Sequence, residues 1–200
     1  AYTRFILKVV GKAVAEPKSS VPSVEKKVQE NVKYTEDKGY GAGYNDVADY
    51  NIGDSVPFEL IGTLPSNYAD YTTYNYVFTD TASTGLTFNQ DSVTVSLVNG
   101  TTTTVIPAAD YTTAFDGQTM TVTFANLKTN TAITADSKIV VKYSATLNAN
   151  AEIGLDGNEN KVTLTYSNNP NTGGTGDTGK TPEDKVIVFT YELDVTKVDG

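Results

Sequence analysis

Three polar residues fall on strand faces that are otherwise apolar. Lys26, Asp80 and Asn160 each lie in a short segment where apolar and polar residues alternate, and each occupies an apolar position. Successive side chains of a strand point to opposite faces, so all three are predicted to point inward. The neighbours on the same faces are Val24 and Val28 for the lysine, Tyr74, Tyr76 and Phe78 for the aspartate, and Val162, Leu164 and Tyr166 for the asparagine.

A lysine, a carboxylic acid and a carboxamide that meet in one core can react with each other. Burial disfavours charge, so it favours a neutral amine and a protonated acid. The neutral amine of Lys26 can then attack the side-chain carbonyl of Asn160, while Asp80 polarises the carbonyl and shuttles protons. Ammonia leaves, and an isopeptide bond joins two strands. The alternative is that each residue lies at a strand end and reaches water, as lysine does by snorkelling.

The composition excludes several classes of function. The 200 residues include no histidine and no cysteine, which removes Ser-His-Asp, Cys-His and histidine–metal chemistry. The net charge of −9 argues against nucleic acid and against an anionic membrane surface as partners. No apolar run approaches the roughly 18 residues of a membrane span. We therefore expect no cofactor, no metal site, no nucleic acid, no membrane contact in this segment and no enzymatic turnover.

The elements that must position the three residues are predicted to be strands. Thr, Val and Tyr recur in short alternating runs separated by turn signals, and a helical period is almost absent. About nine strands of this kind predict an all-β, antiparallel β-sandwich. Residues 107–115 show a weak helical pattern, and residues 29–50 and 168–184 are predicted to be loops. The predicted strands are 3–15, 24–28, 54–64, 74–80, 92–98, 119–124, 138–147, 160–167 and 185–198.

Four segments resemble one known family. The sequence is similar to the isopeptide-forming D2-type domain of Gram-positive fimbrial proteins, which is related to the CnaA fold of collagen adhesins. The resemblance implies an immunoglobulin-like sandwich with an autocatalytic Lys–Asn bond promoted by an aspartate. By motif, these residues are Lys26, Asp80 and Asn160, so any catalysis is a single intramolecular turnover. The matching segments are PSVEKKV at 22–28, YNIGDSVPFEL at 50–60, YNYVFTDTASTGLTF at 74–88 and NKVTLTYSNNP at 160–170.

The resemblance also predicts the organisation and the partners of the chain. Residues 1–20 are expected to be a strand or linker from a preceding domain, and 21–190 the CnaA-like sandwich. Residues 191–200 resemble the first strand of a following CnaB-type domain, whose crosslinking lysine would be Lys197. The expected partners are neighbouring domains of the same surface protein and other pilin subunits joined by a sortase, in an extracellular pilus or cell wall.

The sequence is compatible with two functions. One is a structural module of a pilus, and the other is an adhesin domain that binds a host or community ligand. No segment matches the YPK-type motif whose lysine a sortase uses, and the nearest one, around Lys18, is read as a linker. Residues 170–173 resemble part of an LPxTG sorting signal but are predicted to be a loop. Residues 156–160 are rich in oxygen ligands but lack a full calcium-binding loop, so they are predicted to be a solvated turn.

The asparagine that reacts has two candidates. Asn160 and Asn168 lie eight residues apart, so alternation places both on one face. In an immunoglobulin-like sandwich the strand of Asp80 should pair antiparallel with the strand of Asn160, so the end of one lies beside the beginning of the other. Asn168 would then lie roughly 20 Å from Asp80, too far for proton transfer. Asn160 is therefore the predicted partner of Lys26, with Asn168 as the alternative.

Overall fold

The computed structural model describes residues 21–30 and 43–192. The predicted strand over residues 3–15, the linker lysine Lys18 and the predicted crosslinking residue Lys197 lie outside the described residues. The predicted domain boundaries near residues 20 and 190 therefore stay predictions.

The first sheet carries Lys26 on its first strand. All its strand pairs are antiparallel. Its order is β2 (Tyr44–Asn45), β1 (Val24–Gln29), β4 (Ser55–Thr63), β11 (Lys138–Leu147), β7 (Thr94–Asn99) and β8 (Thr102–Val105), and β6 (Leu86–Phe88) also pairs with β11.

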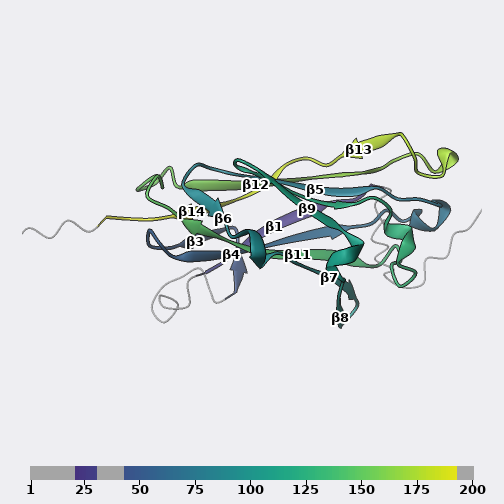
Figure 1. Cartoon of the computed structure of the whole chain (residues 1–200), viewed down its shortest axis with the longest axis horizontal. Helices are drawn as coiled ribbons and strands as arrows, with labels where there is room; N and C mark the ends of the chain where they lie inside the picture. Colours follow the sequence, from purple (N-terminus) through teal and green to yellow (C-terminus); the bar gives the residue numbers. More distant parts are fainter. Residues whose placement is uncertain (1–20, 31–42, 193–200) are drawn as a thin grey trace, which may run out of the picture.

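The second sheet carries Asp80 and Asn160 on two neighbouring strands. Its pairs are antiparallel except that β3 runs parallel to β14. Figure 1 shows the two sheets as layers that run along the long axis of the molecule. The order is β3 (Val47–Asp49), β14 (Asp184–Phe189), β12 (Asn158–Ser167), β5 (Tyr76–Ala82), β10 (Thr119–Phe124) and β9 (Thr112–Asp116), and β13 (Thr178–Lys180) pairs with β12.

The core lies between the two sheets because the central strands alternate. In β4, residues Val56, Phe58 and Leu60 are fully buried, and the residues between them are at least partly exposed. β11 and β12 show the same alternation of burial. The inward faces of both sheets pack against each other and remove apolar side chains from water, which is the main favourable term in folding. The predicted all-β, immunoglobulin-like sandwich is confirmed.

The differences from the sequence prediction lie at the sheet edges. Residues 29–50, predicted as a loop, contain the short edge strands β2 and β3, and residues 168–184 contain β13. Residues 107–115 form a 3-10 turn, Ala108–Asp110, followed by β9 rather than a helix. In the predicted final strand, 185–198, β14 ends at Phe189 and residues 190–192 are not strand, while residues 193–198 lie outside the described residues. An exposed edge strand has no alternation of apolar and polar residues from which it could be predicted. All four residues of β8, which projects from the sandwich in Figure 1, are exposed.

Candidate functional site

Lys26, Asp80 and Asn160 meet in the core between the two sheets. The side chains come from β1, β5 and β12, and all three residues are 0% exposed. β5 and β12 are antiparallel neighbours, as predicted, with Asp80 opposite Val162 and Asn160 opposite Ala82. Because Asn160 lies two residues from Val162, it is a diagonal neighbour of Asp80 on the same face. The alternation of the sequence therefore does bring the three polar residues together, and none of them reaches water.

One hydroxyl group, that of Tyr143 in β11, connects the three side chains. It accepts hydrogen bonds from Lys26 Nζ at 2.7 Å and from Asn160 Nδ2 at 2.8 Å. It donates a hydrogen bond to Asp80 Oδ2 at 3.0 Å, and the same carboxylate oxygen makes a short contact with Lys26 Nζ. Four buried polar side chains thus form one connected network.

Aromatic rings enclose the amine of Lys26. The ring of Phe58 stacks on that of Tyr143, with 5.3 Å between ring centroids. Lys26 Nζ lies 5.2 Å from the centroid of each of these two rings. Phe88 packs on the Tyr143 ring as well, with 5.7 Å between the centroids. The amine of Lys26 therefore lies in an apolar pocket, where a charge is poorly solvated.

Burial shifts the acid–base equilibria of the site toward neutral forms. It lowers the pKa of the Lys26 amine, against the opposing attraction of Asp80. It raises the pKa of the Asp80 carboxyl, against the opposing effects of Lys26 and the Tyr143 hydroxyl. It also raises the pKa of Tyr143 well above its usual range, and the nearby Asp80 adds to this shift. A neutral amine, a protonated acid and a protonated phenol are the forms that burial favours.

Two polar atoms of the cluster have no hydrogen-bond partner. They are Asp80 Oδ1 and Asn160 Oδ1, both fully buried. A buried acceptor without a donor costs free energy, so most buried polar groups in proteins have a hydrogen-bond partner. The cluster is therefore incompletely satisfied at the carboxyl and carbonyl oxygens that an acid-assisted attack would use.

The other residues singled out in the sequence lie elsewhere. Asn168 is exposed and follows the end of β12, and its backbone N–H donates to Asp177 O at 3.2 Å. The solvated turn predicted at residues 156–160 is wrong for residues 158–160, because β12 begins at Asn158 and both Asn158 and Asn160 are buried. The Asn158 amide donates to Glu152 O and Val188 O. Residues 170–172 form a 3-10 turn in a loop, as predicted. Within the described ranges, no group of three or more acidic residues is placed to hold a metal ion.

Sequence reasoning missed Tyr143. It alternates with Val141 and Ala145 on the inward face of β11, where a tyrosine reads as an ordinary core residue. A signal was present, because a buried phenol needs a hydrogen-bond partner and the neighbouring inward residues are apolar. That signal could have indicated that Tyr143 belongs with the three buried polar residues.

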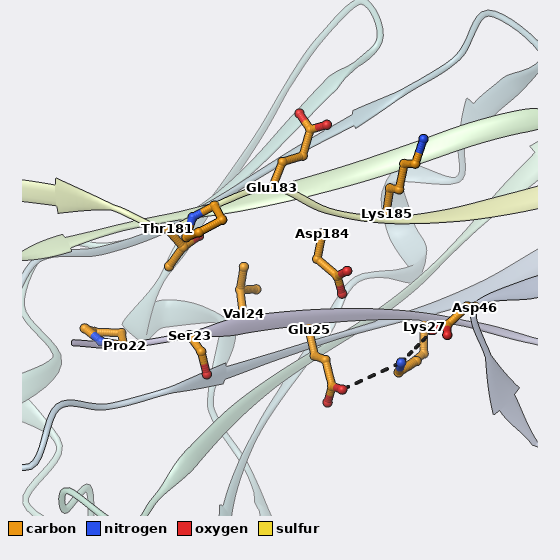
Figure 2. Close-up of a pocket in the computed structure, with 11 residues that line it drawn as sticks. Pro22, Ser23, Val24, Glu25, Lys27, Asp46, Thr181, Glu183, Asp184 and Lys185 are labelled. Carbon is orange, nitrogen blue, oxygen red and sulfur yellow. Dashed lines mark hydrogen bonds and ion pairs between the residues drawn. The ribbon is translucent and has the colours of Figure 1, made fainter. Parts of the chain in front are cut away.

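A groove of about 500 Å³ lies on the outer side of β1, between β1 and the start of β14. Figure 2 shows Glu25 and Lys27 projecting from β1, and Asp184 pointing toward β1 from the other sheet. Lys27 Nζ is ion-paired with Asp46 at 2.6 Å and Glu25 at 3.6 Å. The backbone N–H of Lys26 donates to Asp184 Oδ2 at 2.6 Å. The groove is therefore lined largely by charged side chains, and Asp184 fixes the position of the Lys26 backbone.

Comparison with known families identifies the kind of domain. Residues 52–170 match the family described as Gram-positive pilin backbone subunit 2, Cna-B-like domain. The chain belongs to this family. The match confirms a pilin domain of the Cna-like type, and pilin backbone subunits are structural proteins rather than enzymes. No helix in the described part of the chain is long and apolar enough to cross a membrane.

One curated relative matches nearly the whole of this pilin domain. The trypsin-resistant surface T6 protein of Streptococcus pyogenes serotype M6 is 28% identical over 205 residues, which cover 92% of this chain and 34% of that protein. The pilin domain therefore spans about a third of the length of this relative.

Solved pilin structures share the fold. The T6 backbone pilin of Streptococcus pyogenes superposes with a TM-score of 0.59 at 23% identity, over 85% of this chain and 36% of that one. BcpA, the major pilin subunit of Bacillus cereus, gives a TM-score of 0.61 at 18% identity, over 85% and 40%. The 35 kDa C-terminal fragment of the Streptococcus agalactiae major pilin GBS80 gives 0.61 at 22% identity, over 86% and 56%.

Proposed function

We propose that this pilin domain is a structural module of a Gram-positive surface pilus, stabilised by an autocatalytic isopeptide bond between Lys26 and Asn160. The observation that carries the proposal is the fully buried set of Lys26, Asp80 and Asn160 between the two sheets. A lysine buried in an aromatic pocket against a carboxyl and a carboxamide is costly as a resting arrangement. The arrangement is understandable if the lysine and the amide react, because the product is a neutral amide with no chargeable amine.

The reaction proceeds by attack of the amine on the amide. The lone pair of the neutral Lys26 Nζ forms a bond to Asn160 Cγ, the Cγ–Nδ2 bond breaks, and Nδ2 leaves as ammonia. Protonated Asp80 polarises the carbonyl, which fits the unpartnered buried oxygens Asp80 Oδ1 and Asn160 Oδ1. Overall, one hydrogen moves from Nζ to the departing nitrogen. The amide product carries no charge, so the desolvation penalty of the lysine disappears.

The position of the bond explains how it would serve a fibre. Lys26 lies in β1 of the first sheet and Asn160 in β12 of the second, so the bond would tie the two sheets together. Force applied to the chain before β1 would pass directly into β12 and could not peel β1 away from the sandwich. The closed loop would hold roughly 135 residues, for which the chain-entropy model gives about 5 kcal/mol of stabilisation.

The proposal extends to the subtype, the location and the partners. The aspartate-promoted pattern supports a CnaA-like domain, although the matching family is described as Cna-B-like. The relatives are named as a backbone pilin and a major pilin, which supports a place in the pilus shaft over a ligand-binding adhesin. Other pilin subunits, joined by a sortase, and neighbouring domains of the same surface protein would then be the partners.

Intact-mass measurement of the purified, folded chain tests this proposal. The measured mass should fall below the sequence mass by one ammonia. Lys26→Ala should have its full sequence mass, and Lys27→Ala, which changes the adjacent solvent-facing lysine, should still lose one ammonia. A folded wild-type chain with its full sequence mass would contradict the proposal.

A further inference from the structure

Tyr143 touches both nitrogen atoms that take part in the proposed reaction. Its hydroxyl lies 2.7 Å from Lys26 Nζ, the attacking atom, and 2.8 Å from Asn160 Nδ2, the leaving atom. It is also 3.0 Å from Asp80 Oδ2. The hydrogen bonds of Asp80 go to Lys26 and Tyr143, so the described contacts connect the carboxyl to the leaving nitrogen through the phenol.

We propose that Tyr143 is a catalytic residue of the crosslinking reaction, whose hydroxyl relays a proton from Asp80 to the departing nitrogen of Asn160. This inference rests on the proposed function, because it assigns a step of the same reaction. Amide nitrogen is a poor leaving group until it is protonated, so the step needs a donor at hydrogen-bond distance from Nδ2. In the unreacted site the Tyr143 hydroxyl accepts a hydrogen bond from Nδ2 at 2.8 Å, and it can donate to this nitrogen once attack has made Cγ tetrahedral and Nδ2 an amine.

The relay balances in protons and electrons. After Nζ has bonded to Cγ, Tyr143 donates its proton to Asn160 Nδ2 and takes the carboxyl proton of Asp80 at the same oxygen. The electron pair of the Cγ–Nδ2 bond leaves with the nitrogen as ammonia. Asp80, now a carboxylate, takes the surplus proton from Lys26 Nζ. Asp80 and Tyr143 end as they began, and no other reactant is needed.

The surroundings of Tyr143 suit this role. A phenol oxygen can accept and donate hydrogen bonds at once, as a relay must. The stacked ring of Phe58 and the tilted ring of Phe88 pack against the Tyr143 ring and restrict its position. Burial and the neighbouring Asp80 raise the pKa of Tyr143 well above its usual range, so the hydroxyl keeps the proton that it must donate. Lys26 and Asp80 are the titratable groups that contact this hydroxyl in the described structure.

The test compares Tyr143→Phe with Tyr74→Phe in the full chain. Tyr143→Phe keeps the ring and removes the relay oxygen. Tyr74 is the matched control, because its hydroxyl is also buried but has no hydrogen-bond partner. Each chain, still without the crosslink, is refolded from denaturant. Samples are quenched in acid at timed intervals, and their intact mass is measured to follow the loss of ammonia. Tyr143→Phe should react slower than wild type by about 10²-fold or more, and Tyr74→Phe at the wild-type rate.

The outcomes separate this inference from the proposed function. If wild type loses no ammonia, the crosslink itself is wrong. If wild type reacts and folded Tyr143→Phe reacts equally fast, the crosslink stands and the relay is wrong. Should Tyr143→Phe fail to fold, Tyr143→3,5-difluorotyrosine keeps the ring and hydroxyl but makes the phenol more acidic. In the relay the proton that reaches Nδ2 comes from this phenol, so a more acidic phenol should change the rate at the optimal pH, and a rate equal to that of wild type would overturn the relay.

Discussion

The backbone N–H of Lys26 donates a hydrogen bond to the carboxylate of Asp184 at 2.6 Å, from the edge of one sheet to the edge of the other. β1 pairs with β4 on one side, and its other side is covered by β2 only at Val28 and Gln29. Asp184 therefore accepts a hydrogen bond from a backbone N–H that would otherwise be exposed on an uncovered edge strand. The same contact fixes the backbone from which the reactive amine extends.

Removal of the Asp184 carboxylate should loosen β1 and slow crosslinking. Asp184→Ala leaves the Lys26 N–H without its partner, which should cost about 1–3 kcal/mol of folding stability in the unreacted chain. Glu183→Ala is the control, because Glu183 lines the same groove without bonding to β1. Denaturant unfolding and the timed mass assay measure both effects. Equal stability and equal rates for the two variants would show that Asp184 does not position Lys26.

Loss of the Asp80 carboxyl should stop the reaction without preventing folding. Asp80→Ala and the isosteric Asp80→Asn remove the group that polarises the carbonyl and shuttles protons. Each variant should keep its full sequence mass and melt well below wild type, since it lacks the crosslink and leaves Lys26 without its acidic partner. Circular dichroism checks the fold and intact mass checks the bond. Complete ammonia loss in either folded variant would remove Asp80 from the mechanism.

The crosslink should account for a large part of the stability of the domain. Asn160→Ala keeps the Lys26–Asp80 pair but cannot form the bond, so the free energy of unfolding should fall by about 5 kcal/mol. Asn168→Ala changes the alternative, exposed asparagine and should stay within about 0.5 kcal/mol of wild type. Guanidinium unfolding curves measure the free energy of unfolding of both variants and of wild type. A midpoint for Asn160→Ala equal to that of wild type would be inconsistent with the bond.

The rate of crosslinking should have a bell-shaped dependence on pH. The reactive pair holds one proton, on Asp80, with Lys26 neutral. At low pH both groups are protonated and the amine is charged; at high pH Asp80 has lost its proton. The pKa of Lys26 is lowered and that of Asp80 is raised, so both shifts favour the neutral pair between these limits. A rate that only rises with pH, as for a free lysine, would contradict acid assistance.

The sequence was informative where one face of a strand is buried. Lys26, Asp80 and Asn160 could be found because strict alternation places each among apolar neighbours. The antiparallel pairing of β5 and β12 was expected from an immunoglobulin-like sandwich, and strand direction then favoured Asn160 over Asn168. Tyr143 was missed because a tyrosine is ordinary in a core. Its role depends on β11 lying opposite β5 and β12, which is a long-range relationship that local pattern does not contain.

The sheet edges could not be predicted for a different reason. β8 is exposed along its whole length, so its residues show no periodic burial. β3 pairs with β14 in parallel, and its partner residues, such as Val47 and Ile187, are far apart in the sequence. Such pairing depends on the final arrangement of the sandwich rather than on the strand's own residues.

Sequencing of the crosslinked peptide tests the central claim most directly. The folded wild-type chain is digested with protease, and branched peptides are sequenced by tandem mass spectrometry. The proposal predicts one branch that joins the Lys26 side chain to the Asn160 side chain, with one ammonia lost. A branch from Lys26 to Asn168, or linear peptides that contain unmodified Lys26 and Asn160, would contradict it.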